Sequence, residues 1–207
     1  MPSERRPSRG PLVADTAGVV VPIRSFRLGK ARLAEVLNTH ERDELAREMA
    51  GSVIDAARGL PTVVVSSDSD VAAWARARHV AVIADPGSLD EAADDGRRWV
   101  STSGLDRVIV VHADLPLIRS LDAVLRAGGP SVAAIVPCHR SDGTPVLAVP
   151  ARAPFRFAYG PGSFLRHCEE ARRVGLEVRV VEEPTLRFDV DVADDLAALR
   201  SHATRPA

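Results

Sequence analysis

Short runs of aliphatic and β-branched residues recur along the chain, and segments with apolar residues at helical spacing separate them. The strongest run lies in RVIVVHADLP, residues 107–116, and is typical of a strand buried on both faces of a parallel sheet. Strands are expected at residues 18–23, 62–67, 80–84, 107–116, 131–137, 144–150 and 176–182. This alternation predicts an α/β fold, with helices on both faces of a mostly parallel mixed sheet.

Helical periodicity is clearest in residues 40–58, where Leu45 and Met49 fall on one face. Asn38 and Glu41, three residues apart, have the pattern of a capping box at the start of this helix. Further helices are expected at residues 70–78, 89–101, 120–127, 164–174 and 193–200.

The length and net charge of the chain limit the kinds of protein that it can be. A length of 207 residues and a net charge of −1 fit one globular core without a basic surface for nucleic acid. No run approaches the roughly 20 apolar residues of a membrane-spanning helix, and no apolar signal-peptide core is present. Cys138 and Cys168 lack metal-binding spacing, which favours a reducing compartment. We expect a cytoplasmic protein that contacts neither nucleic acid nor membrane.

One domain is expected over residues 17–200, because no linker interrupts the alternation of strands and helices. Residues 1–16 carry charge and proline without an apolar core, and are interpreted as a disordered leader. Residues 201–207 are interpreted as a frayed tail.

Ligands of open parallel sheets bind outside the carboxyl ends of the strands. This rule selects four loops as candidate binding segments. They are SFRLGKARL at residues 25–33, SSDSD at 66–70, HADLP at 112–116 and FDVDV at 188–192.

Carboxylates are prominent in two of these loops. Asp189 and Asp191 lie two residues apart, so in an extended segment they point to the same side and suit Mg²⁺. The alternative is that Asp191 caps the last helix, with Asp194 in its first turn. Asp114 follows the strongest strand, where it is either a metal-binding acid or a common turn former.

Lys30 is the single lysine among 27 basic residues. It follows Gly29 in a loop that also carries Arg24, Arg27 and Arg32. The functional hypothesis is a triphosphate cradle, in which backbone N–H groups and the compact ammonium bind phosphates. The alternative is a solvated basic loop, and the loop is not a Walker A motif.

Six segments, taken in this order, resemble the CofC/FbiD family, whose members are guanylyltransferases of deazaflavin coenzyme F-420 biosynthesis. They read VPIR, GKARL, HADLP, SDGTPVL, YGPGSF and DVDVADDL, and the resemblance covers residues 18–200. It implies a single-domain, GT-A-like (Rossmann-like) nucleotidyltransferase that joins GTP to phosphoenolpyruvate, 2-phospho-L-lactate or 3-phosphoglycerate and releases pyrophosphate. It implies a monomer or homodimer, with the next enzyme of the pathway as a further candidate partner.

The resemblance also implies roles for individual residues. Metal ligands for Mg²⁺, expected as two ions, are Asp114, Asp189 and Asp191, and the catalytic set is Lys30, Arg32 and Asp114. The nucleotide would contact Arg24, Lys30, Arg32, Ser66, Leu89 and Asp90. The acid would contact Thr144, Gly160 and Ser163, with Ser163 at a helix start where free N–H groups favour an anion.

The chain departs from the family pattern at three places. Arg24 replaces a lysine, Asp90 replaces an asparagine after Leu89, and Pro145 replaces an asparagine after Thr144. These departures leave two alternatives open: a transferase for another phosphorylated or phosphonate acid, and a non-catalytic nucleotide-binding paralogue. A third, a GT-A glycosyltransferase, comes from reading DVD as a metal-binding DxD motif. The position of DVD near the C-terminus argues against the last, whose DxD motif is expected after a central strand.

Overall fold

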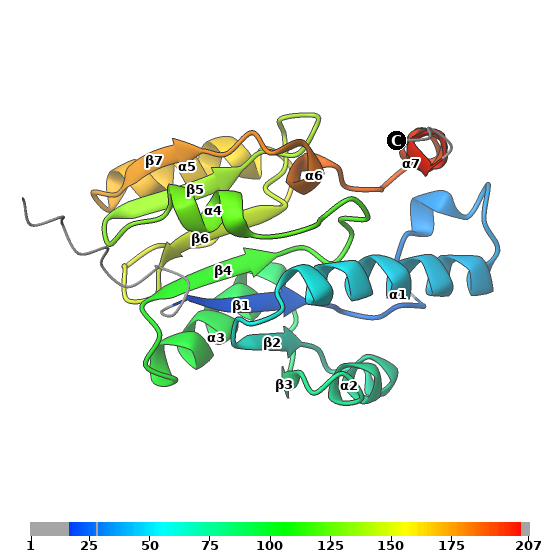
Figure 1. Ribbon diagram of the computed structural model, residues 1–207, viewed down its shortest axis with the longest axis horizontal. Coiled ribbons are helices and arrows are strands. Elements are labelled where there is room, and N and C mark those ends of the chain that lie inside the picture. Colours follow the sequence, from blue (N-terminus) through cyan, green and yellow to red (C-terminus); the bar gives the residue numbers. More distant parts are fainter. Residues whose placement is uncertain (1–16, 28, 204–207) are drawn as a thin grey trace, which may run out of the picture.

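The computed structural model describes residues 17–27 and 29–203, so the expected leader and residues 204–207 lie outside the described residues (Figure 1). Its seven-stranded sheet has the order β3-β2-β1-β4-β6-β5-β7. The strands are β1 (Ala17–Pro22), β2 (Thr62–Val65), β3 (Ala81–Ile83), β4 (Arg107–Val111), β5 (Val132–Val136), β6 (Val146–Pro150) and β7 (Glu177–Val180). All seven expected strands form, which confirms the α/β prediction.

The sheet is mixed because β6 runs against its neighbours. Strands β1 to β4 pair in parallel, β6 pairs antiparallel with both β4 and β5, and β5 pairs in parallel with β7. In register, Ile109 of β4 lies opposite Val19 of β1 on one side and Ala148 of β6 on the other. The strongest apolar run is therefore central in the sheet, as its composition predicts.

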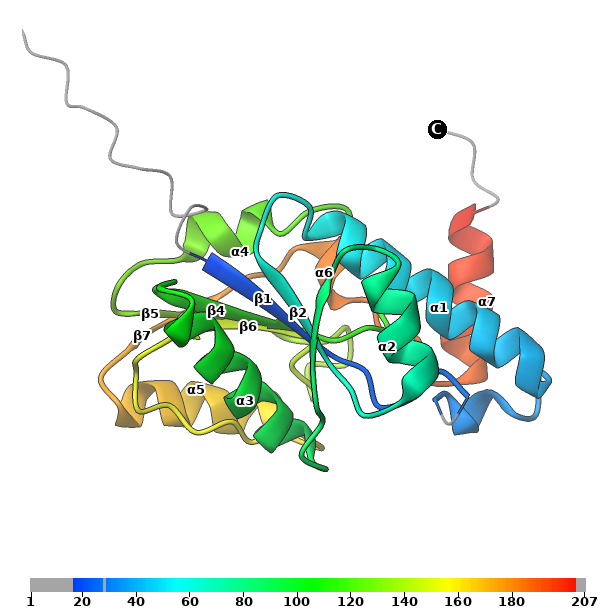
Figure 2. The ribbon, with the colours of Figure 1, turned by 90° about the horizontal axis from the view of Figure 1, so that it is seen from below.

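Helices cover both faces of the sheet (Figure 2). They are α1 (Thr39–Ala56), α2 (Ser69–Arg76), α3 (Leu89–Thr102), α4 (Asp122–Ala127), α5 (Ser163–Arg173), α6 (Pro184–Arg187) and α7 (Ala193–Ala203), with a 3-10 helix at Ala31–Leu33. One apolar core joins α1, α2 and α4 to side chains such as Ile109, and the other joins α3 and α5 to alternate side chains such as Val108. Strands β1 to β6 thus contribute to both cores, because successive side chains point to opposite faces, whereas β7 contributes Val178 to one core.

Local sequence explains several helix boundaries. Asn38 and Glu41 form the expected capping box of α1, with each side chain accepting a hydrogen bond from the backbone N–H of the other residue. Two short helices were missed: α6, which begins with Pro184, and the 3-10 helix that follows Lys30. The last helix continues to Ala203, so the expected tail is helical at its start, where the Ser201 hydroxyl donates to the Ala197 carbonyl.

A third, smaller apolar cluster lies beyond the sheet, where α7 packs beside α1 (Figure 1). Its buried members are Leu33, Leu37, Met49, Val190 and Leu196. Apolar contacts in this cluster hold the segment after Lys30 next to the segment that carries Asp189 and Asp191, although about 160 residues separate them in sequence. No helix in the described part of the chain is both long and apolar enough to cross a membrane.

Candidate active site

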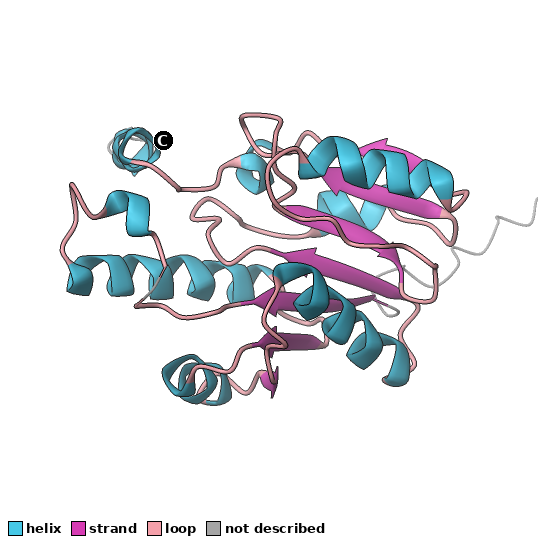
Figure 3. Ribbon diagram, turned by 180° about the vertical axis from the view of Figure 1, so that it is seen from behind, coloured by secondary structure: helices cyan, strands magenta, loops and turns pink. Residues whose placement is uncertain are grey.

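The candidate site lies at the edge of the sheet where the parallel strands end (Figure 3). Here β1 leads into the Lys30 loop, β4 leads into His112 and Asp114, and the chain after β7 and α6 brings Asp189 and Asp191. Because β6 is antiparallel, its beginning lies at this same edge and brings Thr144 there. Segments from four parts of the chain therefore converge on one place, as the strand-end rule predicts.

Lys30 is the centre of the polar contacts at this edge. Its ammonium donates to Asp114 Oδ2 at 2.7 Å and to Asp191 Oδ1 at 3.0 Å. The Lys30 side chain is only 11% exposed, and its backbone is in the left-handed region at φ 59°. The solvated-loop alternative is wrong for Lys30, because its side chain is buried between two carboxylates.

The charges in this cluster shift one another's pKa. Burial alone would lower the pKa of Lys30, but Asp114 and Asp191 outweigh burial and raise it. Burial alone would raise the pKa of Asp114, but Lys30 and then His112 outweigh it and lower it. For Asp189 the balance is reversed: burial, then Asp114 and Asp191, raise its pKa, and the opposing effect of His139 does not offset them. Negative charge therefore outweighs positive charge around Asp189.

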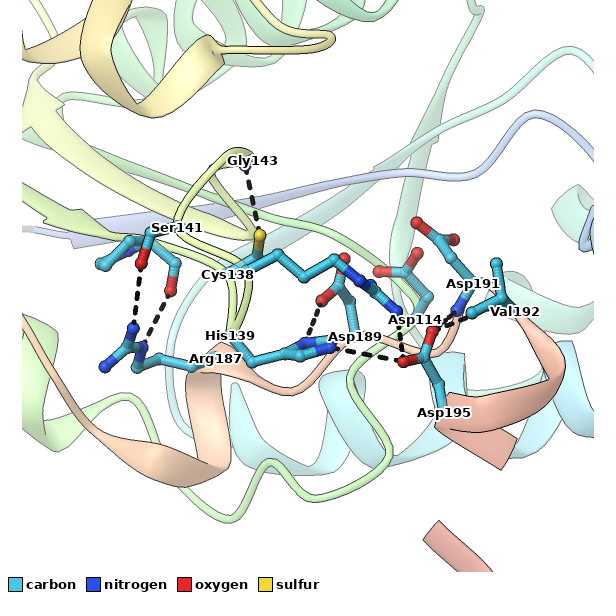
Figure 4. Close-up of polar contacts among 12 residues, drawn as sticks. Asp114, Cys138, His139, Ser141, Gly143, Arg187, Asp189, Asp191, Val192 and Asp195 are labelled. Atoms are coloured by element: carbon cyan, nitrogen blue, oxygen red, sulfur yellow. Dashed lines mark hydrogen bonds and ion pairs between the residues drawn. The ribbon is translucent and has the colours of Figure 1, made fainter. Parts of the chain in front are cut away.

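The segment with Asp189 and Asp191 is held in place by contacts with His139 and Asp195 (Figure 4). His139 lies between two carboxylates, with Nδ1 3.0 Å from Asp189 Oδ1 and Nε2 3.3 Å from Asp195 Oδ1. Asp195 in turn accepts from the backbone N–H groups of Asp191 and Val192, at 2.8 and 3.0 Å. Asp195, in the first turn of α7, thus holds the two residues that precede this helix, and the Asp191 carboxylate accepts from Lys30.

The three aspartates suit a hard cation in their chemistry. In residues 17–27 and 29–203, no three acidic, histidine or cysteine side chains are already arranged around a common metal position, since Lys30 lies between Asp114 and Asp191. Asp114 Oδ1 is nevertheless buried without a hydrogen-bond partner, and Asp189 is held among like charges. A carboxylate oxygen without a donor and an all-oxygen ligand set fit Mg²⁺.

Two cavities meet at Asp114. The first, of about 260 Å³, is lined by the end of β1, the Lys30 loop, the middle of α1, the start of α3 and the segment after β4. The second, of about 410 Å³, is lined by Asp189, Asp191 and the segments that precede β6 and α5. His112, Leu89 and Asp114 line both, so a molecule in one cavity can reach a molecule in the other.

The residues expected to contact the nucleotide do not all line the same cavity. Arg24 and Lys30 line the first cavity, and Arg32 lines the second. Ser66 and Asp90 line neither cavity. Ser66 is buried and accepts a hydrogen bond from the Asp68 backbone, and Asp90 accepts one from the Tyr159 backbone at 2.7 Å. Asp90 therefore joins α3 to the loop before α5 in this structure.

The expected acid contacts come together in the second cavity. Thr144, Gly160 and Ser163 all line it, and Thr144 and Ser163 are 1% and 2% exposed. Gly160 has φ 102°, a conformation that side chains disfavour, so glycine is required there for backbone reasons.

One part of the expectation for the acid site is wrong. Ser163 does begin α5, but the neighbouring N–H groups are not free for an anion. Gly162 donates to the Asp142 carboxylate, Ser163 to the Gly160 carbonyl and Phe164 to the Asp142 carbonyl. An anion here cannot be bound by these three N–H groups as they are arranged.

Sequence reasoning missed the histidines and Asp195. His112 directly precedes the ADLP segment, and its position at a strand end was the available signal. His139 and His167 carried no local signal, because their partners are about 50 and 23 residues away: Asp189 for His139, and Thr144 for His167.

A mostly parallel sheet whose strand ends gather three aspartates and one lysine fits an α/β nucleotidyltransferase. The family profile described as "Guanylyl transferase CofC like" matches residues 17–205. The chain belongs to this family, which confirms the resemblance drawn from its motifs.

Relatives agree with this assignment. A phosphoenolpyruvate guanylyltransferase from Roseiflexus castenholzii is 39% identical over 87% of this chain and 86% of its own length. A 2-phospho-L-lactate guanylyltransferase from Methanothermobacter thermautotrophicus is 30% identical over 88% of this chain and 83% of its own. A solved structure from Desulfovibrio desulfuricans G20, titled as a nucleotide-diphospho-sugar transferase, has a TM-score of 0.74 at 20% identity, covering 93% of this chain and 89% of that one. The structural match supports the fold.

Proposed function

We propose that this protein transfers a guanylyl group from GTP to a small phosphorylated carboxylic acid, with release of pyrophosphate. Phosphoenolpyruvate and 2-phospho-L-lactate are the leading acids, because relatives bearing each name align over most of the chain. The observation that carries the proposal is the meeting of two cavities at Asp114, beside the buried Lys30. We further propose a cytoplasmic role in deazaflavin coenzyme F-420 biosynthesis.

The reaction needs little from a general base. An oxygen of the acid's phosphate bonds to the α-phosphorus of GTP, the bond from that phosphorus to the bridging oxygen breaks, and pyrophosphate leaves with that oxygen. The attacking oxygen is already anionic, so alignment and charge neutralisation are the main tasks of the site. The two adjoining cavities would hold GTP and the acid with their phosphates facing one another near Asp114.

Asp114, Asp189 and Asp191 would hold Mg²⁺, which when bound offsets the charge of the attacking and leaving oxygens. Lys30 would then bind phosphate oxygens with the ammonium that now bridges Asp114 and Asp191. Arg32, exposed on the rim of the second cavity, would add positive charge for the leaving pyrophosphate or the acid. Each role uses a group that already points to this edge.

A pyrophosphate-release screen tests the proposal. GTP, ATP, CTP and UTP are each combined with phosphoenolpyruvate, 2-phospho-L-lactate or 3-phosphoglycerate, in Mg²⁺ and in EDTA. We expect release with GTP and one preferred acid, and none in EDTA. Asp189→Asn should abolish it, whereas Asp55→Asn, an exposed aspartate of α1 away from both cavities, should not. GTP binding without release from any pair would instead favour the non-catalytic alternative.

A further inference from the structure

His167 lies on α5 behind the second cavity and is completely buried. Its ring packs edge-on against Tyr159, with centroids 4.8 Å apart, and lies 5.9 Å from the ring of Phe155. A histidine held in this way cannot turn freely, so its two nitrogens keep their partners. Burial, with smaller effects of Arg166 and His112 that outweigh Glu170, lowers the pKa of His167 to about 4. The imidazole is therefore neutral at pH 7 and carries one N–H proton.

The partners of the ring decide where that proton lies. The backbone N–H of Ala158 donates to His167 Nε2 at 2.9 Å, so Nε2 is the acceptor. The proton must then be on Nδ1, which donates to Thr144 Oγ1 at 3.0 Å. Thr144 Oγ1 is also 3.3 Å from Ser163 Oγ, so the two hydroxyls share one hydrogen bond.

The number of protons in this cluster shows how the tautomer with its proton on Nδ1 affects the two hydroxyls. The imidazole, Thr144 and Ser163 bring three protons to two internal contacts, so one hydroxyl proton remains whichever hydroxyl donates to the other. With the opposite tautomer, Thr144 would donate to Nδ1 and Ser163 to Thr144, leaving no proton. Because Thr144 and Ser163 line the second cavity, the remaining proton can be offered to a hydrogen-bond acceptor there.

We propose that His167 is a positioning residue that keeps the Thr144–Ser163 hydroxyl pair as a hydrogen-bond donor to the carboxylate of the acid substrate. This inference rests on the proposed function, and it assigns recognition of the substrate's carboxylate to Thr144 and Ser163, which line the second cavity. Backbone N–H groups at the start of α5 do not perform it, because those of Gly162, Ser163 and Phe164 are already bound.

A matched pair of variants tests the proposal. In His167→Gln the amide oxygen can replace Nε2 as acceptor for Ala158, but nothing replaces the Nδ1–H donor to Thr144. The hydroxyl pair then keeps its spare proton but loses the contact that orients it toward the cavity. In His167→Asn the amide N–H can replace Nδ1 as donor to Thr144, but Ala158 loses its acceptor. We expect His167→Gln to raise the KM for the acid by about 3–10-fold, the effect of one hydrogen bond, with the KM for GTP unchanged. His167→Asn should retain a lower KM for the acid than His167→Gln does.

Two further measurements make the test decisive. In a Thr144→Val background, His167→Gln should raise the KM for the acid no further. Nitrogen-15 NMR of the wild-type imidazole should show a neutral ring protonated at Nδ1 at pH 7. Equal KM changes for both substrates, additive effects with Thr144→Val, or a ring protonated at Nε2 would each overturn the positioning role. Absence of wild-type turnover with every acid would overturn the proposed function and this inference with it.

Discussion

Replacing Lys30 by methionine removes the one cation between Asp114 and Asp191 while keeping most of the apolar stem. Lys30 and Asp114 side chains are only 11% and 23% exposed, so water compensates poorly for the lost ammonium. Breaking such a buried pair costs about 3–5 kcal/mol in the free energy of unfolding. For a chain of this size that is a fall in Tm of roughly 6–20 °C, at roughly 2–4 °C for each kcal/mol.

The pH dependence follows from the two pKa shifts. The raised pKa of Lys30 means that its contribution is complete below 10.5 and is lost above its folded pKa. The lowered pKa of Asp114 means that its contribution is present above 3.8 and is lost as pH falls through the folded pKa. The gap in Tm between wild type and Lys30→Met should therefore be widest between these limits, and should narrow in acid as the unpaired carboxylates bind protons.

Thermal unfolding followed by circular dichroism, from pH 2.5 to pH 9, measures this effect. Arg58→Met is the control, because it breaks the ion pair with Asp55 at 2.8 Å, where both side chains are 70% or more exposed. Such an exposed pair contributes about 0–1 kcal/mol. If Lys30→Met lowers the Tm no more than Arg58→Met does at pH 7, the ion pairs of Lys30 do not stabilise the fold and the reasoning is refuted.

Three further outcomes are expected. Asp191→Asn should lower turnover by orders of magnitude in the pyrophosphate assay with circular dichroism unchanged, and near-wild-type turnover would exclude its metal role. Lys30→Arg should lower kcat for GTP despite its equal charge, because a planar guanidinium does not fit between two carboxylates spaced for an ammonium; wild-type kinetics would contradict this. Gly96→Ala in α3 should lower the Tm, because its Cβ would lie 2.7 Å from a Val20 methyl group, an overlap that costs about 1–3 kcal/mol. Gly51→Ala in α1 meets nothing within 4 Å and should instead gain about 1 kcal/mol of helix propensity, so that equal Tm changes would disprove the packing argument.

Features that depend on neighbouring residues could be predicted from the sequence. Apolar runs indicated the strands, the Asn38 and Glu41 pair indicated the start of α1, and the strand-end rule brought Asp114 to the same edge as Lys30. In each case the signal lies within a few residues or follows from the parallel direction of strands.

Features that depend on distant residues could not be predicted in this way. Asp195, in the first turn of α7, accepts from the N–H groups of Asp191 and Val192, a contact that neither the metal hypothesis nor the capping alternative for Asp191 included. The N–H groups before α5 are occupied by Asp142, a residue of the preceding hairpin. The tautomer of His167 depends on Ala158 and Thr144, which meet only in the folded chain.

The reversed direction of β6 has a consequence for how substrate preference can change between relatives. Because β5, the hairpin before β6, and the loop into α5 follow one another in the chain, one continuous stretch, residues 138–163, supplies more than half of the residues lining the second cavity. The first cavity is lined only by residues up to Asp114. A single crossover between two genes beyond this position could therefore exchange most of the second cavity and leave the first cavity unchanged.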